Sequence, residues 1–169
     1  GSAIEILRAQ LEALNEKRTA NYAEIYAEQN ATTIEMVLEG YPEEVTAVRY
    51  QMDGYSIAIP NDEWEMTSEN HWQAINNEQI FFEILCTTEA DMAVVAQSCW
   101  GEAGAETTLL NRTSRFFYEN GQTSHLRLLG NDGAGNYYYA LMECFNEAVE
   151  GYGTRMMYIT NTLVIDAVS

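Results

Sequence analysis

The sequence predicts an α+β fold, in which an antiparallel sheet of hairpin and meander units packs against helices and a long helix comes first. Three observations predict this fold. Apolar residues recur at helical spacing over residues 3–29, they alternate with a period of two from residue 33, and two-residue turns typical of β-hairpins join the alternating segments. We expect an N-terminal amphipathic helix over residues 3–29 and a single α+β sheet domain over residues 33–169.

The first helix carries one apolar face. Its large apolar residues are Ile4, Leu7, Leu11, Leu14, Tyr22 and Ile25, and Arg18 is the one polar interruption. Such a face has to pack on something, and it could cover the sheet or pair with a partner helix. The first four apolar positions resemble a heptad, which is too short to establish a coiled coil.

Two hairpins fix most of the predicted sheet. Asp53-Gly54 joins residues 45–52 to residues 55–59, and this turn places Met52 opposite Tyr55, Tyr50 opposite Ile57 and Val48 opposite Ile59. Asn120-Gly121 joins residues 114–119 to residues 122–129, and a glycine-rich loop leads on to residues 136–145. Together, the last three segments predict a three-stranded meander.

The remaining segments are assigned from turn and capping signals. Residues 61–77 have no clear period and predict a loop, and residues 80–86 predict a strand. A helix is expected from a capping box at Thr88 to Trp100, and a final helix is expected after the cap residue Asn146, although Gly151 and Gly153 weaken it. Residues 163–165 predict a short strand.

The charge of the chain excludes some classes of partner. The sequence has 26 acidic and eight basic residues and a net charge of −18, so it would repel nucleic acid and anionic membranes. An acidic excess could attract cations or a basic partner, but its commonest meaning is a soluble, self-repelling surface. No apolar run is long enough to span a membrane.

The sequence shows no cofactor fingerprint, no spaced metal ligands and no nucleophile motif, so we expect no cofactor and no metal, and the sequence favours a binding role over catalysis while leaving catalysis open. Its three cysteines have no paired spacing and are expected to be buried thiols.

The best candidate binding site lies on the second hairpin. The turn places His125 opposite Phe116 and Thr123 opposite Tyr118, with Arg127 on the same face. A histidine, an arginine and two aromatic rings side by side could hold an anionic or planar ligand. The alternative is a solvated sheet face with no ligand.

One short segment resembles a known family. The segment Gly54-Tyr55-Ser56-Ile57-Ala58-Ile59-Pro60, followed by Trp64, is similar to the signature of PsbP-like domains, and the order of elements over residues 45–165 is also similar. The resemblance implies an antiparallel sheet with helices against it. It also implies a binding or assembly module, as in extracytoplasmic proteins and lipoproteins of bacteria. No binding residue of that family can be matched here.

Two functions remain open. The first is a non-catalytic extracytoplasmic module that binds a protein or a cell-envelope component. Because Gly1 and Ser2 are typical of a cloning remnant, we expect that a signal peptide or lipid anchor could have preceded them. The second is a small-molecule pocket, enzymatic or not, that resembles NTF2-like proteins. It requires a deep cavity lined by Tyr137, Tyr139 and Trp72.

Overall fold

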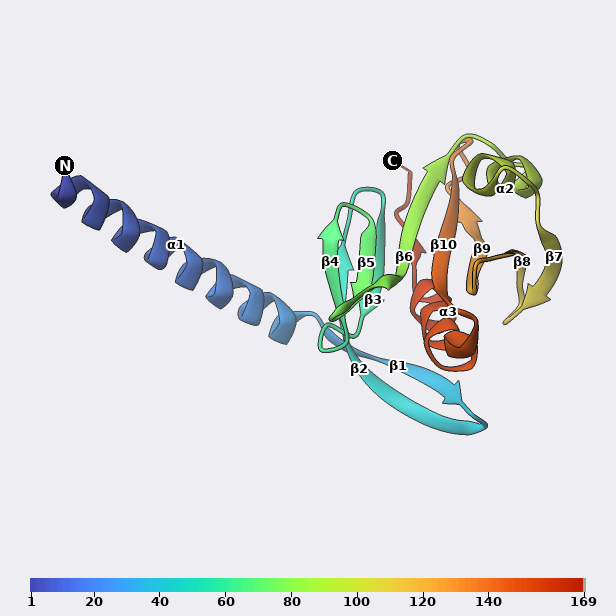
Figure 1. Cartoon of the computed structure of the whole chain (residues 1–169), viewed down its shortest axis with the longest axis horizontal. Helices are drawn as coiled ribbons and strands as arrows, with labels where there is room; N and C mark the ends of the chain where they lie inside the picture. Colours follow the sequence, from blue (N-terminus) through green and yellow to red (C-terminus); the bar gives the residue numbers. More distant parts are fainter. Residues whose placement is uncertain (169) are drawn as a thin grey trace. The chain divides into compact units, whose positions relative to one another are not determined.

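The computed structural model describes residues 1–168 of the 169-residue chain. It divides into two compact units, residues 1–31 and the chain from residue 32 onward. The first unit is essentially helix α1 (Ser2–Gln29), which Figure 1 shows as one uninterrupted helix. The predicted long N-terminal helix is therefore confirmed.

The second unit contains two sheets with antiparallel pairing. The four-stranded sheet has the order β1 (Ala31–Leu38), β2 (Tyr41–Gln51), β3 (Tyr55–Ile59) and β11 (Val164–Ile165). The seven-stranded sheet has the order β4 (Trp64–Ser68), β5 (His71–Ala74), β6 (Asn77–Thr87), β10 (Tyr137–Phe145), β9 (Gln122–Asn131), β8 (Arg112–Glu119) and β7 (Ala105–Leu109). The helices of this unit are α2 (Met92–Trp100) and α3 (Thr154–Asn161). The α+β fold class is confirmed.

Strand β10 lies in the middle of the seven-stranded sheet, between β6 and β9 (Figure 1). Its residues are apolar on both faces, which is typical of a strand that is covered on both sides. On one face, Tyr139 packs in a buried cluster with Met92, Val95 and Ala96 of α2. On the other face, the buried cluster joins Ala140, Met142 and Cys144 to Met156 and Ile159 of α3 and to residues of the four-stranded sheet. The sheet is therefore covered on both faces at β10.

Both predicted hairpin registers are confirmed. Val48 pairs with Ile59 and Tyr50 with Ile57 in the first hairpin, and the second pairs Phe116 with His125 and Tyr118 with Thr123. The first turn needs glycine at position 54, because its φ is +86° and a Cβ there would lie 2.6 Å from the hydroxyl of Tyr138.

The predicted loop over residues 61–77 is wrong, because strands β4 and β5 form a hairpin there. Its turn has Asn70 at a φ of +60° and contains no glycine, so the usual hairpin signal is missing. Trp64 and Trp72 are both only 2% exposed, so this hairpin contributes to the core rather than to a surface loop. Strand β7 was also missed.

The helix boundaries need two corrections. Helix α2 begins after Asp91, whose carboxylate accepts a hydrogen bond from the amide of Ala93 at 2.9 Å, and Thr88 is not the cap. The C-terminal helix is not continuous from Asn146, because residues 146–148 form a 3₁₀ turn and residues 149–153, which include both glycines, form a π-helical turn.

The cysteines also need a correction. All three are free, but only Cys144 is buried, while Cys86 is exposed and Cys99 is half-buried.

Candidate functional site

The structure brings together the residues of the predicted site on β8 and β9. The ring of Phe116 stacks on His125 with centroids 4.2 Å apart and on Tyr118 at 6.3 Å. His125 and Arg127 follow at alternate positions of β9, so they lie on the same face.

This face is not solvated at its centre. Arg127 is fully buried and His125 is 6% exposed, whereas Tyr118 is 64% exposed. The guanidinium of Arg127 donates to the carbonyl of Leu109 at 3.1 Å and to Oδ1 of Asn161, in α3, at 2.8 Å. The alternative of a solvated sheet face is therefore wrong for His125 and Arg127, because the C-terminal helical segment covers them.

The buried histidine is uncharged. Burial, together with the charge of Arg127, lowers the pKa of His125 to about 3. Among the described residues 1–168, none offers a hydrogen-bond partner to Nε2 of this ring. A cavity of about 40 Å³ beside it is lined mainly by apolar groups, including Met142 and Met156. This space is too small for an organic ligand. Arg127 connects the sheet to α3 through Asn161. Ligand binding by Phe116, Tyr118, His125 and Arg127 stays a prediction.

A larger space lies on the opposite face of β8, β9 and β10. We call it the acidic hollow, and its volume is about 330 Å³. Its walls are formed by the end of α2 and by the three strands near the β8–β9 turn. The lining residues are Cys99, Trp100, Phe117, Glu119, Asn120, Gln122, Ser124, Leu141 and Glu143.

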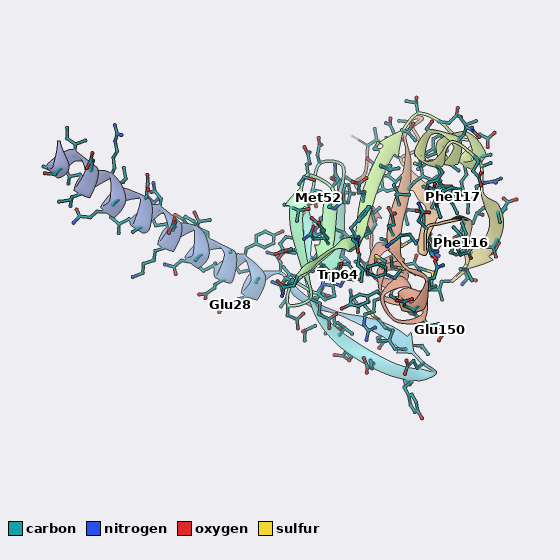
Figure 2. All side chains as sticks on the ribbon, in the orientation of Figure 1. Glu28, Met52, Trp64, Phe116, Phe117 and Glu150 are labelled. Atoms are coloured by element: carbon teal, nitrogen blue, oxygen red, sulfur yellow. The ribbon has the colours of Figure 1, made fainter. Side chains whose placement is uncertain are left out.

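Strand alternation explains how one hairpin serves both faces. Phe116 and Phe117, labelled in Figure 2, are consecutive in β8, and their rings contact different partners. Phe116 stacks on His125, whereas Phe117 stacks on Trp100 of α2 with centroids 5.7 Å apart. The Trp100–Phe117 pair forms an aromatic wall of the acidic hollow.

Carboxylates dominate the electrostatics of the hollow. Burial, and secondly the charge of Glu83, raise the pKa of Glu143. Glu83 belongs to the neighbouring strand β6, and its Oε1 lies 2.6 Å from Nδ1 of His71. None of the nine lining residues is lysine or arginine. A cation entering the hollow would relieve the repulsion between Glu143 and Glu83.

The cysteine in the hollow is poorly suited to nucleophilic catalysis. Burial raises the pKa of Cys99, and the charge of Glu83 raises it further. A reactive cysteine needs the opposite shift, because the thiolate is the nucleophile. Within residues 1–168, no group of three or more histidine, cysteine or acidic side chains could hold a metal ion. The lining instead offers carboxylates and an aromatic face to a positively charged group.

Sequence reasoning missed this hollow. Its acidic and aromatic residues come from α2, β8 and β10, which are distant in sequence. One signal was present: Tyr137, Tyr139 and Leu141 share a face of β10 with Glu143, so a carboxylate ends an otherwise apolar row.

The packing does not favour the NTF2-like alternative, which needs one deep cavity lined by Tyr137, Tyr139 and Trp72. Tyr139 is fully buried against α2, whereas Trp72 is stacked on Phe82 in the other core cluster. These rings fill two separate cores on opposite faces of the sheet instead of lining one deep cavity.

Comparisons with known proteins show a weak structural likeness. No family model matches the sequence, and no curated protein matches it. The solution structure of cyanobacterial PsbP (CyanoP) from Synechocystis is similar, with 10% sequence identity, a TM-score of 0.45, and coverage of 71% of this chain and 92% of that chain. The fold class follows from the helices and strands of this chain.

Proposed function

We propose that this chain is a non-catalytic extracytoplasmic binding module, and that the acidic hollow receives a lysine or arginine side chain of a protein partner. The observation that carries the proposal is the hollow itself. It combines a volume of about 330 Å³, an aromatic wall and glutamates without a basic residue in its lining. That volume is at the lower end of ligand pockets, which suits one side chain better than a large cofactor.

The chemistry of the hollow favours a cation over a neutral ligand. Glu143 and Glu119 would accept hydrogen bonds from an ammonium or guanidinium group, and the Trp100 ring offers a face for cation–π contact. Binding would also lower the pKa of Glu143, because a positive charge favours its ionised form.

The proposed location outside the cytoplasm, with a lipid anchor on a preceding segment, is supported by the lysine-poor, acidic composition and by the PsbP-like segment around Gly54. Within residues 1–168, no helix has both the length and the apolar character to cross a bilayer. Fractionation of the source cells, with antibody detection of the protein, tests this location: recovery with the cytoplasmic fraction would contradict it.

The binding proposal is tested with a short arginine- and lysine-containing peptide, followed by the fluorescence of Trp100. Trp64 and Trp72 are 2% exposed, so a change caused by the peptide should come mainly from Trp100 and be lost in Trp100→Phe. We expect saturable binding that Glu143→Gln weakens about tenfold, because a hydrogen bond to a charged group is lost.

The matched control is Glu147→Gln, which removes the same charge at an exposed position outside the hollow. A peptide in which citrulline and norleucine replace the basic residues should not bind. Equal weakening by both glutamate substitutions would show non-specific attraction to an acidic protein and would overturn the proposal, as would the absence of saturable binding.

A further inference from the structure

Helix α1 has an exposed apolar face, which is separate from the acidic hollow. The helix has 28 residues, and none of them is buried. Most helices in proteins are stabilised by packing of an apolar face rather than by intrinsic propensity. The apolar face of α1 therefore needs a partner.

The shape of that face indicates what the partner is. We call it the α1 stripe, and its members are Ile4, Leu7, Leu11, Leu14, Tyr22 and Ile25, which are 49–64% exposed. On an ideal helix of 3.6 residues per turn, these six positions and Arg18 fall within an arc of roughly 80°. A helix that covers a sheet or a globular core usually has a wider apolar face, whereas a narrow stripe is the seam of a coiled coil.

The charges of α1 are arranged for contact with a copy of itself. On the same helical projection, Glu5, Glu12 and Glu16 lie on the side opposite the stripe, and so does Glu24. The positions that flank the stripe along its first half are Arg8, Gln10 and Asn15. Two copies can therefore approach along most of the stripe without bringing carboxylates together, although the chain carries a net charge of −18.

The area is sufficient for a weak dimer. Burying the stripe and its flanks would remove about 600 Å² from each copy, or about 1,200 Å² in total, which is the lower limit for specific protein interfaces. Arg18 interrupts the seam, and a single polar residue at such a position fixes register at a cost in stability. From these observations we infer that α1 pairs with α1 of a second copy of this chain in a reversible coiled-coil dimer.

The test is sedimentation equilibrium of the full chain between about 5 and 500 µM, a range that brackets a micromolar Kd. We expect the mass to rise from one copy to two copies over this range. Leu11→Glu should leave the chain monomeric throughout. Arg18→Leu should tighten the dimer about tenfold or more, because it adds an apolar layer to the seam.

The matched control is Ile6→Glu. Ile6 is 58% exposed and Leu11 is 59% exposed, but Ile6 lies off the stripe, so this control introduces the same charge without touching the seam. It should dimerise like the unmodified chain. Far-UV circular dichroism of the dilute proteins confirms that the α+β domain is folded in every variant.

Three results would overturn the inference. A monomer at every concentration would mean that the stripe is covered by another part of the same chain or by a different partner. Equal loss of dimer in Ile6→Glu and Leu11→Glu would place the contact outside the stripe. A mass above two copies would rule out a simple pair.

Discussion

Asn161 accepts a hydrogen bond from Arg127, and the amide oxygen lies 2.8 Å from Nη2 of the guanidinium. The same oxygen accepts from Nε of Arg112 at 2.9 Å. One neutral side chain at the end of α3 therefore accepts hydrogen bonds from two arginines of the sheet. Burial, with the nearby charge of Arg112, lowers the pKa of Arg127 to about 10.

This geometry predicts opposite effects for two substitutions at one position. Asn161→Ala removes the acceptor shared by Arg112 and Arg127 and should lower the free energy of unfolding by about 2–4 kcal/mol, since hydrogen bonds to charged groups are the stronger kind. Asn161→Asp keeps the acceptor and adds a counter-charge, so its stability should equal or exceed that of the original chain. Urea denaturation at pH 7 measures both. An aspartate variant as unstable as the alanine variant would contradict the interpretation.

The buried His125 predicts a loss of stability in acid. Its pKa is lowered from 6.5 to about 3, so between these values the unfolded chain binds a proton that the folded protein does not. Stability therefore falls as the pH decreases through this interval, by roughly 3 kcal/mol between pH 7 and pH 4. His125→Phe keeps a ring to stack on Phe116 and should remove this contribution. Urea denaturation at several pH values should give a flatter curve for the variant, and parallel curves would be the contrary result.

The raised pKa of Glu143 predicts that its contribution to stability changes with pH in the direction opposite to that of His125. Its pKa is raised, so the folded protein holds a proton that the unfolded chain has released over the interval between the two pKa values. The ionised carboxylate therefore costs stability at neutral pH, and this cost disappears as the pH falls. We expect Glu143→Gln to have a higher Tm than the original chain at pH 7.5, with the difference closing in acid. Glu147→Gln, at an exposed site, should show a smaller change, and equal changes would point to net charge alone.

Gly104 supports the aromatic wall of the acidic hollow. Its φ is +66°, and a Cβ there would collide with the carbonyl of Phe116 and lie 2.9 Å from Cζ3 of Trp100. Gly101 also has a positive φ, of +78°, but open space surrounds it. Gly104→Ala should therefore be destabilised by about 2 kcal/mol more than Gly101→Ala, because it adds overpacking to backbone strain. Thermal unfolding measures the difference. Similar losses in the two variants would assign the effect to the backbone alone.

Local turn chemistry made much of the sheet predictable from the sequence. Asp53-Gly54 and Asn120-Gly121 set both the position and the register of their hairpins, because two-residue turns leave no freedom in strand pairing. The hairpin of β4 and β5 turns through Asn70 without glycine, so the sequence lacked that signal.

The surroundings of the candidate sites were harder to predict than the strands. The register correctly placed His125 beside Phe116, but burial of that pair depends on α3, which follows in the chain by about 30 residues. The acidic hollow depends on the stacking of Trp100, in α2, on Phe117, in β8. This is a tertiary contact between a helix and a strand, and no local sequence pattern predicts it.

Helix α1 has a consequence for how tightly the module could hold its partner. A dimer joined through the α1 stripe would carry two acidic hollows, each with a modest affinity for one basic side chain. Once a partner with two such side chains is held at one hollow, capture at the second becomes intramolecular and depends on effective concentration rather than on bulk concentration. Retention of a bivalent partner would then vary with the expression level of this protein, whereas retention of a monovalent one would not.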